Sequence, residues 1–133
     1  MRIFLAASYG RRYEMRVYRA ELQTHGHAVT SSWIDEDLSA MEEVALSPAE
    51  KAEYARRDLD DILASELFAL FTDPPGQSRS LGGRHTELGA ALSIQGIRIV
   101  LIGEPENIYH HLPEITRVPD WQSFLADLLA NRI

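Results

Sequence analysis

Ser80-Leu81-Gly82-Gly83-Arg84-His85-Thr86-Glu87-Leu88-Gly89-Ala90-Ala91-Leu92 is the stretch around which the chain is organised. It starts as a polar loop and continues as an apolar helix, with two glycines at the joint and one carboxylate, Glu87, about one turn into the helix. Glycine lets a backbone approach a ligand closely, and the first N–H groups of a helix lack internal partners and carry partial positive charge. The stretch therefore predicts a site for an anionic or strongly polar ligand, with Glu87 ionised and pointing at it. An ordinary glycine-started helix is the alternative.

Short apolar segments alternate with helical patterns on both sides of this stretch. The apolar runs predict strands at residues 3–7, 28–33, 67–71 and 97–102, with a short edge strand at 116–118. The helical patterns cover residues 11–25, 47–65, 83–95 and 120–131. Ser47-Pro48-Ala49-Glu50 is a helix start with a capping Ser, and residues 35–47 read as a loop with one short helical turn. This order predicts one α/β domain, residues 1–133, with a parallel sheet of four to five strands and helices on both faces.

The composition excludes several classes of function. The chain has 133 residues and no cysteine, which excludes disulfides, thiolate catalysis and cysteine-based zinc sites. The net charge of −7 argues against a nucleic-acid polymer as a partner but not against a small nucleotide. No segment is long enough for a transmembrane helix, and the first apolar run is too short for a signal peptide. We therefore expect no membrane partner and a cytoplasmic location.

Polar residues follow the strands at the edge where a parallel sheet binds ligands, the carboxyl ends of its strands. The loops concerned are residues 8–10, 72–83 and 103–107. Tyr9 directly follows the first strand, Asp58 lies in the second helix, and Glu87 starts the third. Two carboxylates and a tyrosine around a glycine-lined pocket suit attack at the anomeric carbon of a sugar.

Each of these residues also has a structural interpretation. Tyr9 could pack with its hydroxyl in water, and Asp58 could belong to an exposed acidic face of its helix with Asp60 and Asp61. Asn107, in the loop after the fourth strand, could be a turn residue. The residues alone leave these alternatives open.

Histidines and arginines offer further hypotheses. His85-Thr86-Glu87 matches the first half of the zinc-deaminase signature, but the second half needs two cysteines, so we reject a zinc site. We expect no metal and no cofactor, and we expect four histidines in surface or loop positions: His25, His27, His110 and His111. Arg11, Arg12, Arg79 and Arg84 flank the predicted ligand edge, either as phosphate donors or as solvated charges.

Three stretches together resemble a known family. They are Phe4-Leu5-Ala6-Ala7-Ser8-Tyr9, then Asp58 four residues before Ile62, then Gly83-Arg84-His85-Thr86-Glu87-Leu88-Gly89. The tail Glu106-Asn107-Ile108-Tyr109-His110-His111-Leu112-Pro113 looks like a compact branch of the same family. The chain resembles the nucleoside 2-deoxyribosyltransferases, a family that includes the 2'-deoxynucleoside 5'-monophosphate N-hydrolases.

The resemblance implies a flavodoxin-like or Rossmann-like doubly wound sheet and a double-displacement mechanism. By this resemblance Glu87 is the nucleophile that attacks C1' of a 2'-deoxyribosyl group and forms a covalent intermediate. Asp58 helps to protonate the departing base, and Tyr9 positions Glu87 by hydrogen bonding. A second base then accepts the sugar in transferases, and water accepts it in hydrolases. The partners implied are a small nucleoside or nucleotide and further copies of the chain, in a homodimer or larger homo-oligomer.

The hydrolase branch of the family binds a 5'-phosphate with a Ser-Leu-Gly loop just before the helix of the catalytic Glu. Ser80-Leu81-Gly82-Gly83 resembles this loop, but it lies one residue further from Glu87 than in that branch. The substrate-binding residues that we expect are Ser8, Gly10, Ser80, Gly82, Gly83, Arg84 and Asn107. Two other functions stay open. One is cleavage of NAD-like or modified nucleotides at the N-glycosidic bond, and the other is a nucleotide-sensing module whose Glu87 is vestigial.

Overall fold

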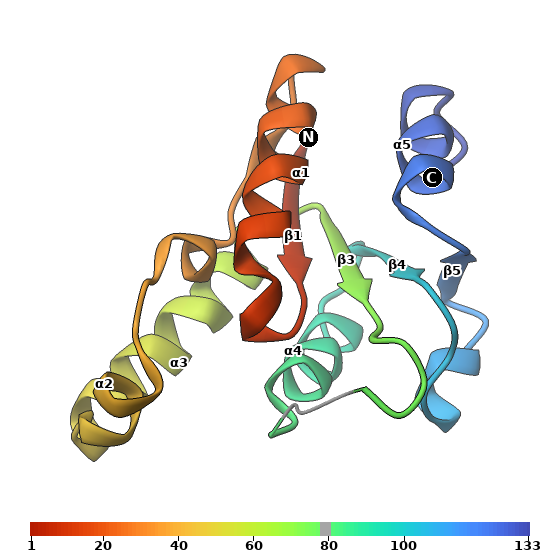
Figure 1. The fold of residues 1–133 in the computed structure, drawn as a ribbon. Coiled ribbons are helices and arrows are strands. Elements are labelled where there is room, and N and C mark those ends of the chain that lie inside the picture. Colours follow the sequence, from red (N-terminus) through yellow and green to blue (C-terminus); the bar gives the residue numbers. More distant parts are fainter. Residues whose placement is uncertain (78–80) are drawn as a thin grey trace.

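A five-stranded parallel sheet in the order β2-β1-β3-β4-β5 forms the centre of the protein (Figure 1). The computed structural model describes residues 1–77 and 81–133, apart from the side chain of Ala40. Its strands are β1 (Arg2–Ala6), β2 (Ala28–Val29), β3 (Leu67–Phe71), β4 (Arg98–Ile102) and β5 (Ile115–Val118). Its α-helices are α1 (Arg12–Thr24), α2 (Ala40–Ala45), α3 (Pro48–Leu63), α4 (Gly83–Leu92) and α5 (Trp121–Leu129), and its 3₁₀ helices are η1 (Tyr9–Arg11), η2 (Ser32–Asp35) and η3 (Ile108–His111). The predicted α/β fold with a parallel sheet is confirmed.

The three interior strands, β1, β3 and β4, explain why the sequence contains unbroken apolar runs. Every residue of β3 is buried, as are the last four residues of β1 and of β4. Phe4 of β1 stacks on Phe68 of β3, with 5.5 Å between the ring centroids. A parallel strand covered by helices on both faces has no solvent side, so alternation of apolar and polar residues disappears.

The helices form a layer on each face of the sheet. Tyr18 of α1 stacks on Trp121 of α5 at 4.1 Å and on Phe71 of β3 at 5.5 Å, so α1 and α5 share one face. Right-handed crossovers from β2 over β1 to β3, and from β3 to β4, place α3 and α4 on the opposite face. None of the helices in the described parts of the chain is both long and apolar enough to cross a membrane.

The second strand is much shorter than predicted. The pattern predicted residues 28–33, but β2 contains only Ala28 and Val29. The Ser31 hydroxyl accepts a hydrogen bond of 2.6 Å from the Leu5 N–H, and the Trp33 indole N–H donates one of 2.8 Å to the Leu5 carbonyl. Side chains thus satisfy the β1 backbone that a longer β2 would have paired with, and the chain turns into η2.

Paired capping boxes start the two helices that follow. Ser47 accepts from the Glu50 N–H and Glu50 accepts from the Ser47 N–H, both at 3.1 Å, which confirms the predicted start of α3. Ser39 and Glu42 make the same exchange at the start of α2. A capping box satisfies two helix-end N–H donors at once, so it favours the helix even in the short, exposed α2.

Candidate active site

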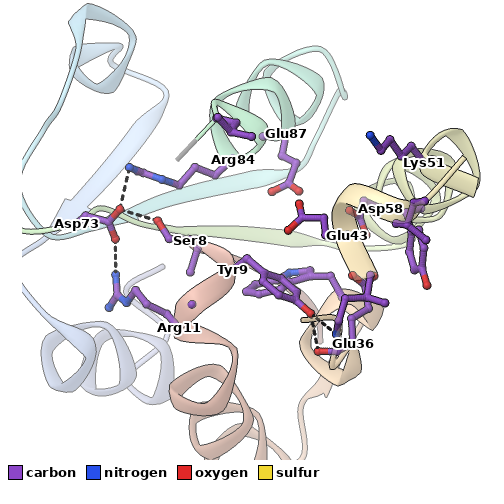
Figure 2. Close-up of a pocket in the computed structure, with 18 of the residues that line it drawn as sticks. Ser8, Tyr9, Arg11, Glu36, Glu43, Lys51, Asp58, Asp73, Arg84 and Glu87 are labelled. Carbon is purple, nitrogen blue, oxygen red and sulfur yellow. Dashed lines mark hydrogen bonds and ion pairs between the residues drawn. The ribbon is translucent and has the colours of Figure 1, made fainter. Parts of the chain in front are cut away.

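A cavity of about 1000 Å³ opens at the carboxyl ends of β1 and β3. From β1 the chain passes to β2 at one edge of the sheet, and from β3 it passes to β4 and β5 toward the other edge. The strand order therefore reverses between β1 and β3, which is the switch point where such sheets bind ligands. The cavity is lined by residues 7–11 after β1, by α3 and α4, by residues 36–46 and by the segment after β3 (Figure 2). The predicted edge of the sheet is therefore the edge that carries the cavity.

Two of the predicted catalytic carboxylates reach this cavity from different helices. Glu87 comes from the first half of α4 and Asp58 from the second half of α3, and both line the cavity. Figure 2 shows the Glu87 carboxylate pointing across the cavity toward the side that carries Asp58. Asp60 is exposed, and Asp61 accepts a hydrogen bond from the Ser32 N–H at 2.9 Å. Asp58 thus differs from its two acidic neighbours in facing the cavity.

The two carboxyl groups are both difficult to ionise. Burial raises the pKa of Glu87 to about 8, and the negative charge of Asp58 adds to the shift. Burial also raises the pKa of Asp58 to about 6; the charge of Arg57 opposes the rise and that of Asp61 adds to it. The sequence predicted that the helix start keeps Glu87 ionised, whereas burial raises its pKa above neutral in this structure. Near pH 7 the pair holds one proton.

Tyr9 lines the cavity, but its hydroxyl faces the segment that covers it. The hydroxyl donates to the Glu36 carbonyl at 3.0 Å and accepts from the Leu38 N–H at 2.9 Å. Both partners lie in residues 36–38, just before α2, rather than at Glu87. Tyr9 therefore holds the segment that leads into α2. The resemblance implied a hydrogen bond from Tyr9 to Glu87 instead.

The polar end of the cavity is a network of charges around Asp73. Ser8 donates a hydrogen bond of 2.5 Å to Asp73, and the guanidinium groups of Arg84 and Arg11 lie 3.2 Å and 3.6 Å from its carboxylate. Arg84 also pairs with Glu106 at 2.6 Å, and its side chain is 1 % exposed. The predicted phosphate cation Arg84 thus lines the cavity while it is ion-paired with two carboxylates.

The other predicted binding residues divide between the cavity and its surroundings. Gly10 and Gly83 line the cavity, and Gly82 precedes α4 with a φ of 96°, a left-handed conformation that favours glycine. Asn107 accepts from the Tyr109 N–H at 3.0 Å and caps η3, and it is not among the described residues that line the cavity. Ser80, the predicted phosphate ligand, lies outside the described residues.

Three functional-site candidates were missed in the sequence. Asp73 is the second residue after β3, inside the loop that the sheet-edge rule had selected, so its position was a usable signal. Glu43 and Val44 reach the cavity from α2, where weak periodicity gave no signal. Figure 2 shows the Glu43 carboxylate pointing toward that of Glu87.

His110 lies in a loop, as one of the two predicted alternatives has it, but it is not at the surface. It belongs to η3 in the loop after β4, it is 0 % exposed, and its Nδ1 accepts a hydrogen bond of 3.0 Å from the Glu106 N–H. Burial, above all, lowers the pKa of His110, so the ring is a neutral acceptor that holds the loop after β4. His25 and His111 are exposed as expected. In residues 1–77 and 81–133, no three His, Cys, Asp or Glu side chains are grouped to hold a metal ion.

Fold and cavity together define a flavodoxin-like α/β protein with paired carboxylates at its switch point. The structure is similar to that of CMP N-glycosidase BcmB from Clostridium botulinum, with a TM-score of 0.60 and 22 % sequence identity. The match covers 98 % of this chain and 99 % of that protein. No protein-family model and no curated protein matches the sequence. At this identity the likeness establishes the fold, and it confirms the fold that the sequence resemblance implied.

Proposed function

We propose that this protein cleaves the N-glycosidic bond of a nucleoside or nucleotide. The observation that carries the proposal is the Asp58–Glu87 pair, two carboxyl groups with raised pKa values that line one cavity at the switch point of the sheet. Raised pKa values in a cleft are typical of acid–base and nucleophilic groups. The likeness to a CMP N-glycosidase supports the same reaction class.

Glu87 is the proposed nucleophile. Its carboxylate oxygen forms a bond to C1', the C1'–N bond breaks, and the electron pair of that bond goes to the base. Asp58 gives its proton to the base as it leaves. The sugar passes through a positively charged transition state, which a neighbouring carboxylate stabilises. In the second step the acceptor attacks C1', releases Glu87 and returns a proton to Asp58.

The shared proton decides when this mechanism can operate. The reaction needs Glu87 ionised and Asp58 protonated. However, Asp58 has the lower pKa of the two, about 6 against about 8 for Glu87. Between about pH 6 and pH 8 the pair holds one proton, which lies mainly on Glu87. The active form, with the proton on Asp58, is therefore the less populated of the two protonation states. We expect a bell-shaped dependence of kcat/KM on pH with limbs near these two values.

Two acceptors fit the second step. Transfer of a 2'-deoxyribosyl group to another base is the activity that the sequence resemblance favours. Hydrolysis of a nucleoside 5'-monophosphate is the second candidate, and the likeness to a CMP N-glycosidase favours it. A contact of Ser80 and Arg84 with the 5'-phosphate would support the second candidate, and it remains a prediction.

Three incubations separate these possibilities. Deoxyadenosine with free cytosine tests transfer, deoxynucleoside monophosphates test hydrolysis, and CMP tests the ribonucleotide. Base exchange supports the transferase, and release of base from monophosphates alone supports the hydrolase. Intact-mass measurement of the quenched enzyme should show a covalent sugar adduct. Binding without any turnover would contradict the enzyme and support a nucleotide sensor.

The proposed assembly is a homodimer or larger homo-oligomer. The sequence resemblance is its source, because sites in that family are completed by a neighbouring subunit. Light scattering coupled to size-exclusion chromatography measures the assembly directly. A monomer with full activity would contradict this part of the proposal.

A further inference from the structure

The helix that carries Glu87 begins, like α1, without a capping side chain. Side chains cap three other helices, namely α2 by Ser39, α3 by Ser47 and α5 by Asp120. The residue before α4 is Gly82, which has no side chain to serve as a cap. Glycine is an accepted residue at this position but contributes no side-chain hydrogen bond, so contacts made by later residues of the first turn contribute to the placement of α4.

Arg84 provides that interaction. It is the second residue of α4, its side chain is 1 % exposed, and its guanidinium donates to both Glu106 oxygens, at 2.6 Å and 2.8 Å. The same guanidinium donates to Asp73 at 3.2 Å. A bidentate arginine–carboxylate pair fixes direction as well as distance, so the pair with Glu106 sets the rotation of α4 about its axis.

Glu106 is in turn held by parts of the molecule that do not belong to α4. The Asp73 N–H donates to its side chain at 3.0 Å, and its own N–H donates to the buried His110 at 3.0 Å. Burial raises the pKa of the Glu106 carboxyl, but the hydrogen bond and charge of Arg84 outweigh this effect and hold the pKa below its ordinary value. An ionised Glu106 thus links the end of β3, the loop after β4 and the start of α4.

We propose that Glu106 is a positioning residue: through Arg84 it directs Glu87 into the cavity. Arg84 and Glu87 are three residues apart and therefore lie on the same face of α4, and both line the cavity (Figure 2). The inference rests on the proposed function, in which Glu87 must reach C1' at bonding distance. A misplacement of about 1 Å can reduce a rate about 100-fold.

The test compares Glu106→Gln with Glu104→Gln, an exposed carboxylate two residues earlier in the same loop. Gln keeps the length of Glu106 but cannot accept two hydrogen bonds from Arg84. With a nucleoside substrate, which has no 5'-phosphate for Arg84 to contact, we expect kcat to fall about 30- to 100-fold and KM to stay within about twofold, because the main change is the direction of the nucleophile. Glu106→Asp, which keeps the charge, should recover part of the lost kcat. Glu104→Gln should match the wild type.

Hydrogen exchange provides a readout that does not need turnover. Amides in the first turns of α4 should exchange about 10-fold faster in Glu106→Gln, while those of α5 stay unchanged. Because the loss of one carboxylate partner of the buried Arg84 can lower stability, the double variant Arg84→Met/Glu106→Gln removes both charges, and it should show the same loss of kcat with the nucleoside substrate.

Two results would overturn the inference. One is a folded variant with wild-type kcat, even if its Tm is lowered, because that is a purely structural role. The other is unchanged exchange in α4. If the wild type cleaves no nucleoside or nucleotide, the proposed function fails, and the exchange measurement still decides whether Glu106 positions α4.

Discussion

The two sides of the cavity differ in how their charges are held. On the sheet side, Ser8, Asp73 and Arg84 are joined by hydrogen bonds and ion pairs and are largely shielded from solvent. On the helical side, Glu43 stands on the exposed helix α2. Asp58 reaches the cavity from α3, and its Oδ1 is buried with no hydrogen-bond partner among the described residues.

This difference indicates that the two sides of the cavity have different roles. A compensated network keeps its geometry, because moving any member leaves a charge without its partner. A carboxyl group without a compensating partner instead responds to its surroundings through its pKa, as Asp58 and Glu87 both do. Glu87 comes from a helix that the network holds, and Asp58 from the less constrained side. We infer that the sheet side fixes the nucleophile and that the helical side exchanges protons.

Replacing Glu87 tests the sheet side and has the largest expected effect. Glu87→Gln keeps the size of the side chain but cannot form the glycosyl bond, so kcat/KM should fall by at least about 1000-fold. Release of base measures the activity, and circular dichroism should show an unchanged fold. The control is Glu53→Gln, an exposed carboxylate on α3. Activity within tenfold of the wild type would contradict the role of Glu87.

Replacing Asp58 tests the helical side and should cost less. Asp58→Asn removes the proton donor, and we expect kcat to fall about 100-fold. Because the charge of Asp58 contributes to the high pKa of Glu87, that pKa should fall below about 8 in the variant. Carboxyl ¹³C chemical shifts against pH measure it.

Asp60→Asn serves as the matched control for Asp58→Asn. Asp60 lies two residues further along α3 and is exposed, so its loss should leave both kcat and the Glu87 titration unchanged. An equal effect of the two replacements would mean that Asp58 acts only through the acidity of α3 as a whole.

Much of the fold was predictable from the sequence, because local signals in the strands and at the helix starts agree with the tertiary structure. The range of β3 was predicted without error, and the capping Ser47 marked the start of α3. The predicted sheet edge brought Asp58 and Glu87 into one cavity, since strand order alone determines which loops meet there. The raised pKa of Glu87 was not predictable, because it depends on burial by distant segments.

The features that were missed depend on hydrogen bonds between side chains and backbone groups. β2 ends early because Ser31 and Trp33 bond to the backbone of Leu5, more than 20 residues away. His110 is buried because the Glu106 N–H needs its ring as an acceptor. Neither bond leaves a periodic pattern in the sequence. A residue's position just after a strand predicts that it belongs to the site, but only the structure shows which group each side chain bonds to.

The capping serines of α2 and α3 allow a finer comparison within the helical side. Ser39→Ala and Ser47→Ala each remove one capping box, a loss of about 1 kcal/mol. α3 packs against α4 and η2, so Ser47→Ala should lower the global free energy of unfolding by about that amount. The exposed α2 should instead fray locally, so Ser39→Ala should raise KM up to about fivefold with little change in Tm. Urea unfolding and steady-state kinetics measure the two effects, and equal losses of stability would contradict a loosely attached α2.

The pH dependence of stability gives the smallest effect and tests the pair without any substrate. The pKa of Glu87 is about 8 in the folded protein against an ordinary value of 4.5, so the folded state binds more protons than the unfolded chain between these values. The stability that this proton contributes is complete below about pH 4.5 and is lost as the pH rises to about 8. Glu87→Gln has no such loss. Its Tm relative to that of the wild type should therefore rise between pH 5 and pH 8 by about 3 °C or more, which corresponds to about 1 kcal/mol in a chain of this length. The exposed control Glu53→Gln should show a constant difference across the same range. A constant difference for Glu87→Gln would mean that the pKa of Glu87 is not raised in the folded state, and the contrast between the titrating pair Asp58–Glu87 and the compensated network around Asp73 would then disappear.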